Sequence, residues 1–156
     1  MKKKRRTILL IIGLLLLFSI VIFFLCMPKS NPPLDIDENA VSWEGNQDLD
    51  TPNQHSKQIE IPGFQSLVFK ANQTEQKVNF YNPVSNSCLF LMTFYADDTE
   101  LWHSGYISPG NGYYDITLSD TLAVGNYDGS LLIQCYKEDG TTLNSAEVNF
   151  DLYVEE

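Results

Sequence analysis

Short β-rich runs, separated by turn clusters at regular intervals, fill the chain from residue 59 to its end. This spacing, with no 3.6-residue apolar period in the same region, is typical of an all-β domain. From Val148 to Val154 apolar and polar residues alternate, which predicts a strand with one buried face. The run 88–96 is apolar on both faces, which predicts a central strand. The expected strands are 64–69, 77–82, 88–96, 100–104, 113–118, 126–137 and 146–154.

Seven such strands in a single domain predict an immunoglobulin-like two-sheet antiparallel β-sandwich. The stretch from Thr121 to Leu131 supports this fold class, because Leu122, Gly125 and Tyr127 have the spacing of a tyrosine corner. In that motif the glycine allows a turn with positive φ, the leucine fills the bottom of the core, and the tyrosine hydroxyl bonds to upstream backbone. A strand follows rather than a helix, so the glycines are not expected to cradle a phosphate. Gly129 is expected inside the strand, where a neighbour needs space.

The N-terminus has a different character. Five consecutive basic residues, 2–6, precede an uncharged run from Thr7 to Met27. As a helix this run is about 30 Å long, which matches the hydrocarbon thickness of a bilayer. A cleaved signal peptide has a shorter apolar core that ends in small residues, and a lipoprotein signal places a small residue before its cysteine, where this chain has Leu25 before Cys26. The sequence therefore predicts a basic cytoplasmic tail (1–6) and an uncleaved transmembrane helix (7–27), with the remainder outside the cytoplasm.

Residues 28–58 are rich in Pro, Asn, Asp, Gln and Ser, which predicts a flexible stalk that leads to a domain at 59–156. Trp43 is the one Phe, Tyr or Trp residue of this stalk, and it is either loose or docked on the domain or on a partner. After the predicted membrane helix, the chain has 20 acidic residues and five basic ones. Such a surface repels phosphates, so nucleic acid is not an expected partner.

Cys88 begins the third expected strand and Cys135 ends the sixth. In an immunoglobulin-like sandwich those strands are antiparallel neighbours, so both cysteines are expected near the same end of one sheet. An extracytoplasmic location permits a disulfide between them. Two buried reduced thiols, which pack as small apolar groups, are the alternative.

No residue pattern predicts catalysis, a metal site or a cofactor. His103 and Ser104 are adjacent on one strand, so their side chains should point to opposite faces and cannot form a catalytic pair. The acidic hairpins at 97–100 and 138–139 are expected at opposite ends of the sandwich, where they cannot share an ion. A nucleotide cofactor would need a βαβ unit with a glycine-rich turn, which the sequence lacks.

Aromatic residues flank the turn at 108–112. Trp102, Tyr106 and Tyr113 form a candidate binding patch that could stack on a sugar ring or fill a pocket of a partner. Strand alternation places Tyr114 inside the core and Tyr113 outside it. Packing of these aromatics within the domain is the alternative.

Four segments carry a resemblance: Ile61–Gly63, 81–83, 101–110 and 122–136. Through them the domain resembles small, membrane-anchored, uncharacterised surface proteins of Gram-positive bacteria that are often carried on mobile elements. The resemblance implies an immunoglobulin-like ectodomain with no established catalytic residues. The expected function is a non-enzymatic protein-interaction or display module at the cell surface, either by itself or as an accessory of an envelope-spanning or conjugation assembly. A carbohydrate-binding module for wall glycans and a protease-inhibitor-like sandwich are the alternatives.

Overall fold

The computed structural model describes residue 18 and residues 34–44, 59–63 and 65–156. The chain divides into two compact units, Met1–Pro32 and Pro33–Glu156, and all elements below belong to the second. The predicted tail and, except for Phe18, the predicted transmembrane helix lie outside the described residues. Within the described ranges, no helix has both the length and the hydropathy needed to cross a bilayer.

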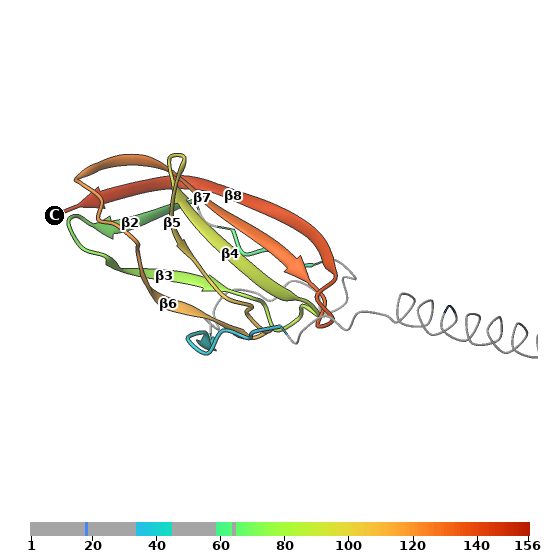
Figure 1. The fold of residues 1–156 in the computed structure, drawn as a ribbon. Coiled ribbons are helices and arrows are strands. Elements are labelled where there is room, and N and C mark those ends of the chain that lie inside the picture. The colour runs from blue at the N-terminus through green and yellow to red at the C-terminus, as the bar shows by residue number, and fades with distance from the viewer. Residues whose placement is uncertain (1–17, 19–33, 45–58, 64) are drawn as a thin grey trace, which may run out of the picture. The chain divides into compact units, whose positions relative to one another are not determined.

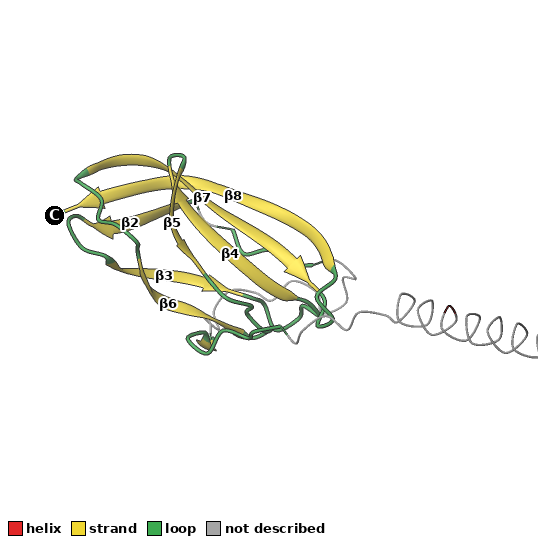
Figure 2. Cartoon of the chain, in the orientation of Figure 1, coloured by secondary structure: helices red, strands yellow, loops and turns green. Residues whose placement is uncertain are grey.

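The second unit is all-β in its described residues, as the sequence predicts (Figures 1 and 2). The strands are β1 (Val41–Ser42), β2 (Ser66–Lys70), β3 (Glu75–Tyr81), β4 (Leu89–Ala96), β5 (Thr99–His103), β6 (Asn111–Thr117), β7 (Gly125–Tyr136) and β8 (Thr142–Glu155). They form a three-stranded sheet, β1-β6-β3, and a five-stranded sheet, β2-β8-β7-β4-β5. Every pairing is antiparallel except that of β2 with β8. Seven strands match the seven expected runs, and β1 is an addition.

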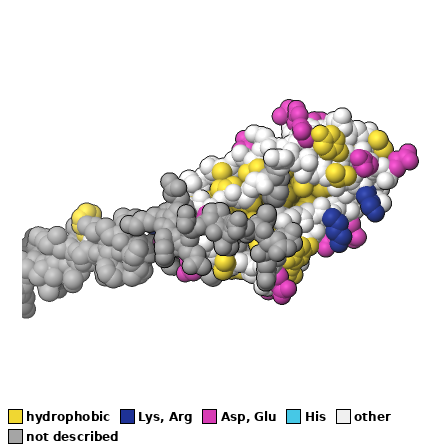
Figure 3. Space-filling model, turned by 180° about the vertical axis from the view of Figure 1, so that it is seen from behind, with side chains coloured by type: hydrophobic (Ala, Val, Ile, Leu, Met, Phe, Trp, Pro, Cys, Tyr) yellow, Lys and Arg dark blue, Asp and Glu magenta, His cyan; other side chains and the backbone are white. Residues whose placement is uncertain are grey.

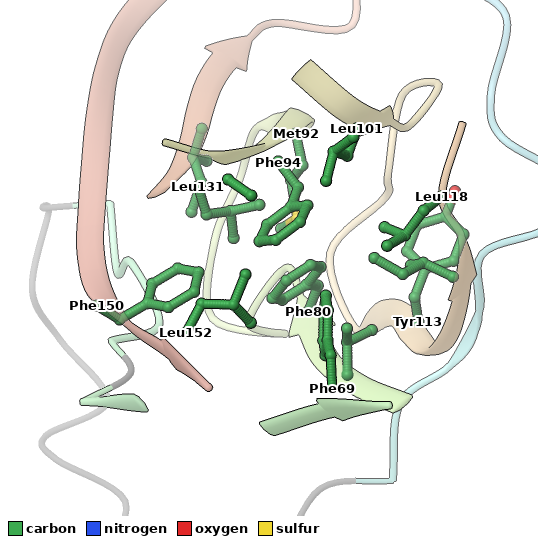
Figure 4. Packing of buried hydrophobic residues seen from close by; sticks show 14 of the residues in the cluster. Phe69, Phe80, Met92, Phe94, Leu101, Tyr113, Leu118, Leu131, Phe150 and Leu152 are labelled. Atoms are coloured by element: carbon green, nitrogen blue, oxygen red, sulfur yellow. The ribbon is translucent and has the colours of Figure 1, made fainter. Parts of the chain in front are cut away.

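The core lies between the two sheets and draws on side chains from both (Figure 4). Phe80 of β3 and Phe94 of β4 meet across it with ring centroids 6.2 Å apart. Phe94 also packs against Phe69 at 5.5 Å and Phe150 at 6.2 Å. The alternation in β8 buries Phe150, Leu152 and Val154, which confirms the predicted one-sided strand. The architecture is therefore a β-sandwich-like pair of sheets that closes over an aromatic core.

The predicted orientation of Tyr113 and Tyr114 is wrong. Tyr113 is 6% exposed, whereas Tyr114 is 40% exposed. The cause is a register shift between Lys77 and Phe80 of β3, which places Tyr113 directly opposite the buried Phe80. Directly opposed residues of an antiparallel pair share a face, so Tyr113 follows Phe80 into the core. A bulge of this kind breaks the period of two on which the prediction relied.

Two of the predicted turns form hairpins, but one differs in length. Asp97 and Asp98 join β4 to β5 as a two-residue turn, with Asp97 at a φ of 51°. Asp139–Gly140 is a dipeptide that favours a two-residue hairpin turn. Instead, Lys137 and Thr141 are hydrogen-bonded across a three-residue loop, in which Gly140 has a φ of 82°. This is the common three-residue hairpin loop, in which a left-handed glycine completes the reversal.

Part of the predicted flexible stalk belongs to the folded domain. Residues 34–44, here named the strap, contribute β1, whose Val41 and Ser42 pair with Gly112 and Asn111 of β6. The prediction of a stalk over 28–58 is therefore wrong for 34–44, and the domain begins well before the predicted residue 59. Residues 28–33 and 45–58 lie outside the described residues. Composition misled here because polar residues can also be held in place by hydrogen bonds to a neighbouring surface.

Candidate functional site

The strap is held at its centre by the carboxylate of Asp37. Asp37 Oδ2 accepts hydrogen bonds from the Gly105 backbone N–H at 2.5 Å and from the Tyr113 hydroxyl. Its other oxygen accepts from the backbone N–H of Asn39 at 2.9 Å. Burial alone would raise the pKa of Asp37, but the hydrogen bonds from Tyr113, Gly105 and Asn39 outweigh it and lower this pKa below its ordinary value. The strap therefore presents an ionised carboxylate to two donors of the domain, the Gly105 N–H and the Tyr113 hydroxyl, while Asn39 of the strap donates to its other oxygen.

The surface that receives this carboxylate is built from two segments of the domain. Gly105 follows β5, and a Cβ at this position would lie 3.0 Å from the Asp37 Cβ. Tyr113 lies in β6 with its ring in the core and its hydroxyl at the edge of the strap. Burial and the neighbouring Asp37 carboxylate raise the pKa of Tyr113, so its hydroxyl remains a proton donor at neutral pH. The close approach at Gly105 and the fixed hydroxyl together define a carboxylate-binding position.

The C-terminal end of the strap is held by Trp43. Its indole ring stacks on Tyr81 with centroids 3.6 Å apart and planes 5° from parallel. The indole Nε1–H donates to Asn79 Oδ1 at 2.6 Å, and the Trp43 backbone N–H donates to the Gly110 carbonyl at 2.9 Å. The two possibilities left open for Trp43 are thus resolved: it is docked on the domain. Aromatic stacking with a satisfied indole N–H is typical of a recognition contact.

The predicted aromatic patch lies beside the strap rather than forming an open surface. Tyr106 forms a β-bridge with Ile36, and its carbonyl accepts from the Asp37 N–H at 2.9 Å. Tyr113 binds Asp37, and Trp102 contacts Tyr113 edge to face at 5.0 Å. The three predicted residues therefore do not make one exposed patch. Two of them contact a segment of the same chain.

Sequence reasoning missed several residues of this site: Asp37, Asn79, Tyr81, Gly105 and Gly110. Trp43 was the one available signal, since a single tryptophan in a polar segment needs an apolar partner. The partners themselves could not be found from sequence, because they lie on strands far away in the chain.

A second surface feature is an acidic hollow of about 750 Å³, lined by residues of β7 and β8 and by the turn between β4 and β5. Asp97, Asp98, Asp128, Glu147 and Asp151 line it, with no lysine or arginine among the lining residues. Asp128 and Asp151 are directly opposed on β7 and β8, and like charges in this relation destabilise a sheet. Figure 3, which views one face of the molecule, shows acidic side chains more widely spread than basic ones. The hollow contributes to a strongly negative surface.

The described residues include no group of three or more His, Cys, Asp or Glu side chains that could hold a metal ion. The acidic hairpins at 97–98 and 138–139 lie at opposite ends of the strands, because Ala96 pairs with Gly129 and Leu89 pairs with Tyr136. His103 contacts Glu100 at 3.0 Å on the exposed side of β5. Ser104 is 5% exposed and is held by the Met92 N–H and the Gly105 carbonyl. The two neighbours thus have separate surroundings, as strand geometry predicts.

Cys88 and Cys135 lie together at one end of the five-stranded sheet. β4 and β7 are antiparallel neighbours, as predicted, and Phe90 pairs with Cys135. Both cysteines are buried, and the structure places no bond between their sulfur atoms. Burial raises the pKa of both thiols, and the hydrogen-bonded neighbour Cys88 helps to raise that of Cys135 to about 12. The disulfide remains a prediction, with the two partners already side by side.

The Leu122–Tyr127 stretch forms a corner at the start of β7. The Tyr127 hydroxyl donates to the Ala123 carbonyl at 3.0 Å, which is the hydrogen bond that the predicted tyrosine corner requires. Leu122 packs against the core. The prediction of positive φ at Gly125 is wrong, because Gly125 is the first residue of β7 and pairs with Val154. Gly129 does make space for a neighbour, since a Cβ there would lie 2.3 Å from the Phe150 ring.

A scan against protein-family models, a search of the curated proteins and a search of the solved structures each found no match to this chain.

Proposed function

We propose that this chain is a non-enzymatic interaction or display module at the cell surface. In this proposal residues 7–27 anchor it as a single transmembrane helix, with residues 1–6 in the cytoplasm. The β-domain then lies outside the cytoplasm, as the basic cluster before the apolar run favours. The anionic surface of the domain suits a protein that must remain soluble and selective at an envelope.

The observation that carries the interaction role is the way the domain holds the strap. Its surface binds an extended segment through a carboxylate position, a backbone pairing with β6 and an aromatic stack. Strand addition at a sheet edge, with side-chain positions that give specificity, is a recurring mode of peptide recognition. The domain thus already has the chemistry of a peptide-binding surface.

The strand order supports an immunoglobulin-like assignment for the domain. One sheet pairs β3 with β6, and the other places β4, β7 and β8 in consecutive order. These pairs correspond to the B–E and C–F–G pairs of immunoglobulin sandwiches. β5 then corresponds to the additional strand beside C in variable-type domains, and the tyrosine corner precedes the strand that corresponds to F. We propose this fold class on that basis.

The carbohydrate-binding alternative loses its main support because it relied on Tyr113 facing outward. Tyr113 is buried and Trp102 is half-buried, so neither offers an open ring face of the kind expected for sugar stacking. The protease-inhibitor alternative gains no specific contact from the structure. A protein partner is therefore the proposal we carry forward.

The test uses the full chain in bacterial cells with a tag at each end. We expect the chain to stay in membranes after an alkaline wash, and protease added to intact cells to remove only the C-terminal tag. A Leu15→Lys variant is the matched control, because a lysine at the centre of a membrane helix costs roughly 3 kcal/mol. A protected C-terminal tag in the wild type would contradict the proposed topology.

The interaction role is tested on the same material. We expect a membrane protein to co-purify with the chain and to persist after enzymatic removal of glycans. Loss of the partner on glycan removal, together with loss of wall retention in Trp102→Ala, would favour the carbohydrate alternative instead.

A further inference from the structure

The strap and its surface have the properties of a ligand and its binding site. The strap contributes one carboxylate (Asp37), one small side chain packed on the core (Ala40) and one aromatic ring (Trp43). The domain provides a complementary group for each. At Gly105 any side chain would press against Asp37, so the surface is cleared for this segment. The fit is specific to the strap.

The strap is nevertheless attached to the domain by a small area of contact. β1 has two residues, and only two residue pairs join it to β6. Ile36 is 42% exposed and Val41 is 50% exposed, so these two side chains bury little apolar surface against the domain. The strap is held mainly by hydrogen bonds and one aromatic stack at the surface, and it adds no large side chain to the buried core. A segment of this kind opens at a lower free energy than the core strands do, so it can undock while the two sheets remain folded.

From these observations we propose that the strap exchanges between copies, so that the site on one chain binds residues 34–44 of a second copy. This inference rests on the proposed interaction function. A second copy needs no new complementary surface, because every contact between strap and domain within one chain is made again between two chains. Exchange of an identical element is a low-cost route to association for that reason. Residues 45–58 tether each strap to its own domain and span at most about 50 Å when fully extended, which permits a neighbouring copy to be reached.

A cysteine pair that is split between two copies tests the exchange. Ser42 and Asn111 are directly paired on β1 and β6, and paired residues in antiparallel strands have the Cα separation that a disulfide needs. One copy carries Ser42→Cys with one tag, and the other carries Asn111→Cys with a second tag. Both chains are full-length and membrane-embedded, and both carry Cys26→Ser so that this cysteine cannot cross-link. Cys88 and Cys135 are kept, because both are buried and cannot reach a cysteine of another chain.

We expect mild oxidation to give a reductant-sensitive heterodimer that carries both tags. Its yield should be several-fold higher than that of a control pair with Thr117→Cys, which is exposed on β6 and unpaired with the strap. Asp37→Asn in the chain that carries Ser42→Cys should reduce the heterodimer several-fold. A control chain carries both Ser42→Cys and Asn111→Cys, and a disulfide formed within this single chain reports that the strap docks on its own domain.

Three results would overturn the exchange. A heterodimer yield no higher than the Thr117→Cys control means that the strap remains within its own chain. An unchanged yield with Asp37→Asn means that the cross-link does not report the docked strap. Failure of the single-chain pair to oxidise means that the docking itself is absent. Membrane retention and tag accessibility in the same cells report the proposed function independently of all three.

Discussion

Asp37→Asn is the most informative single change in the strap. The substitution keeps the shape of the side chain but removes its charge, and it places an amide N–H₂ where one carboxylate oxygen accepted hydrogen bonds. With the amide oxygen toward Tyr113 and Gly105, these groups donate to a neutral acceptor and the Asn39 N–H meets the amide N–H₂. With the amide flipped, the N–H₂ meets the Gly105 N–H and the Tyr113 hydroxyl instead. We expect the strap to detach more often while the two sheets remain folded.

The size of the effect follows from the hydrogen bonds. A hydrogen bond to a charged group contributes about 1.5–3 kcal/mol and a neutral one about 0.5–1.5 kcal/mol, so each of the two bonds at Oδ2 loses roughly 1 kcal/mol. The site is partly open to solvent, and screening reduces this sum to about 1–2 kcal/mol. The loss caused by Asp37→Asn cannot exceed the docking free energy of the strap. Once the strap is detached, Asp37 is in water and its hydrogen bonds no longer matter.

Hydrogen exchange of the indole N–H groups measures this opening directly. The chain has two tryptophans, and the Trp43 Nε1–H is bonded to Asn79 only while the strap is docked. A loss of about 1–2 kcal/mol accelerates its exchange roughly 5- to 30-fold. Asp35→Asn is the matched control, because it removes a charge from the same strap at a residue that is exposed. Equal exchange rates in the two variants would refute the assigned role of Asp37.

The same assay has a defined dependence on pH. The folded pKa of Asp37 is lowered, so its stabilisation is fully present above the ordinary value of 3.8 and is lost as pH falls through the folded pKa. The ratio of exchange rates between Asp37→Asn and wild type should therefore be constant from pH 7 to pH 5, begin to fall near pH 3.8 and approach one only below the lowered pKa of folded Asp37. A ratio that does not change over this range would contradict the hydrogen-bonded carboxylate.

Three further predictions concern the domain itself. Tyr127→Phe removes the hydrogen bond to Ala123, and urea unfolding should show a loss of about 1 kcal/mol; unchanged stability would argue against the corner. Gly129→Ala forces a methyl group against Phe150, and thermal unfolding should report a loss of about 1–3 kcal/mol; a stability equal to wild type would mean that the ring has room to move. A disulfide between Cys88 and Cys135 predicts no reactive thiol in a denatured Cys26→Ser chain prepared without reductant; two reactive thiols would exclude it.

The strand content could be predicted because it depends on local signals. The alternation in β8 and the apolar run of β4 each report burial at neighbouring positions, and both were confirmed. The hairpin at Asp97–Asp98 has residues that favour a turn, and it forms where predicted. Such signals need no knowledge of distant segments.

The orientation of Tyr113 could not be predicted because a bulge on another strand sets it. The register shift lies in β3, about 35 residues away in the chain, and changes which face of β6 enters the core. Asp37 could not be identified for a similar reason. Its role depends on Gly105 and Tyr113, which no spacing pattern connects to the strap.

The sequence by itself determined the all-β class and the position of most strands, because periodicity and turn residues act over a few positions. The tertiary structure alone decided that residues 34–44 fold onto the domain and contact two residues of the predicted aromatic patch, Tyr106 and Tyr113. They lie in a longer segment, 28–58, whose composition resembles a linker, and such segments become ordered only where a surface offers partners for their hydrogen bonds and apolar side chains. That surface exists only once β3, β5 and β6 have come together.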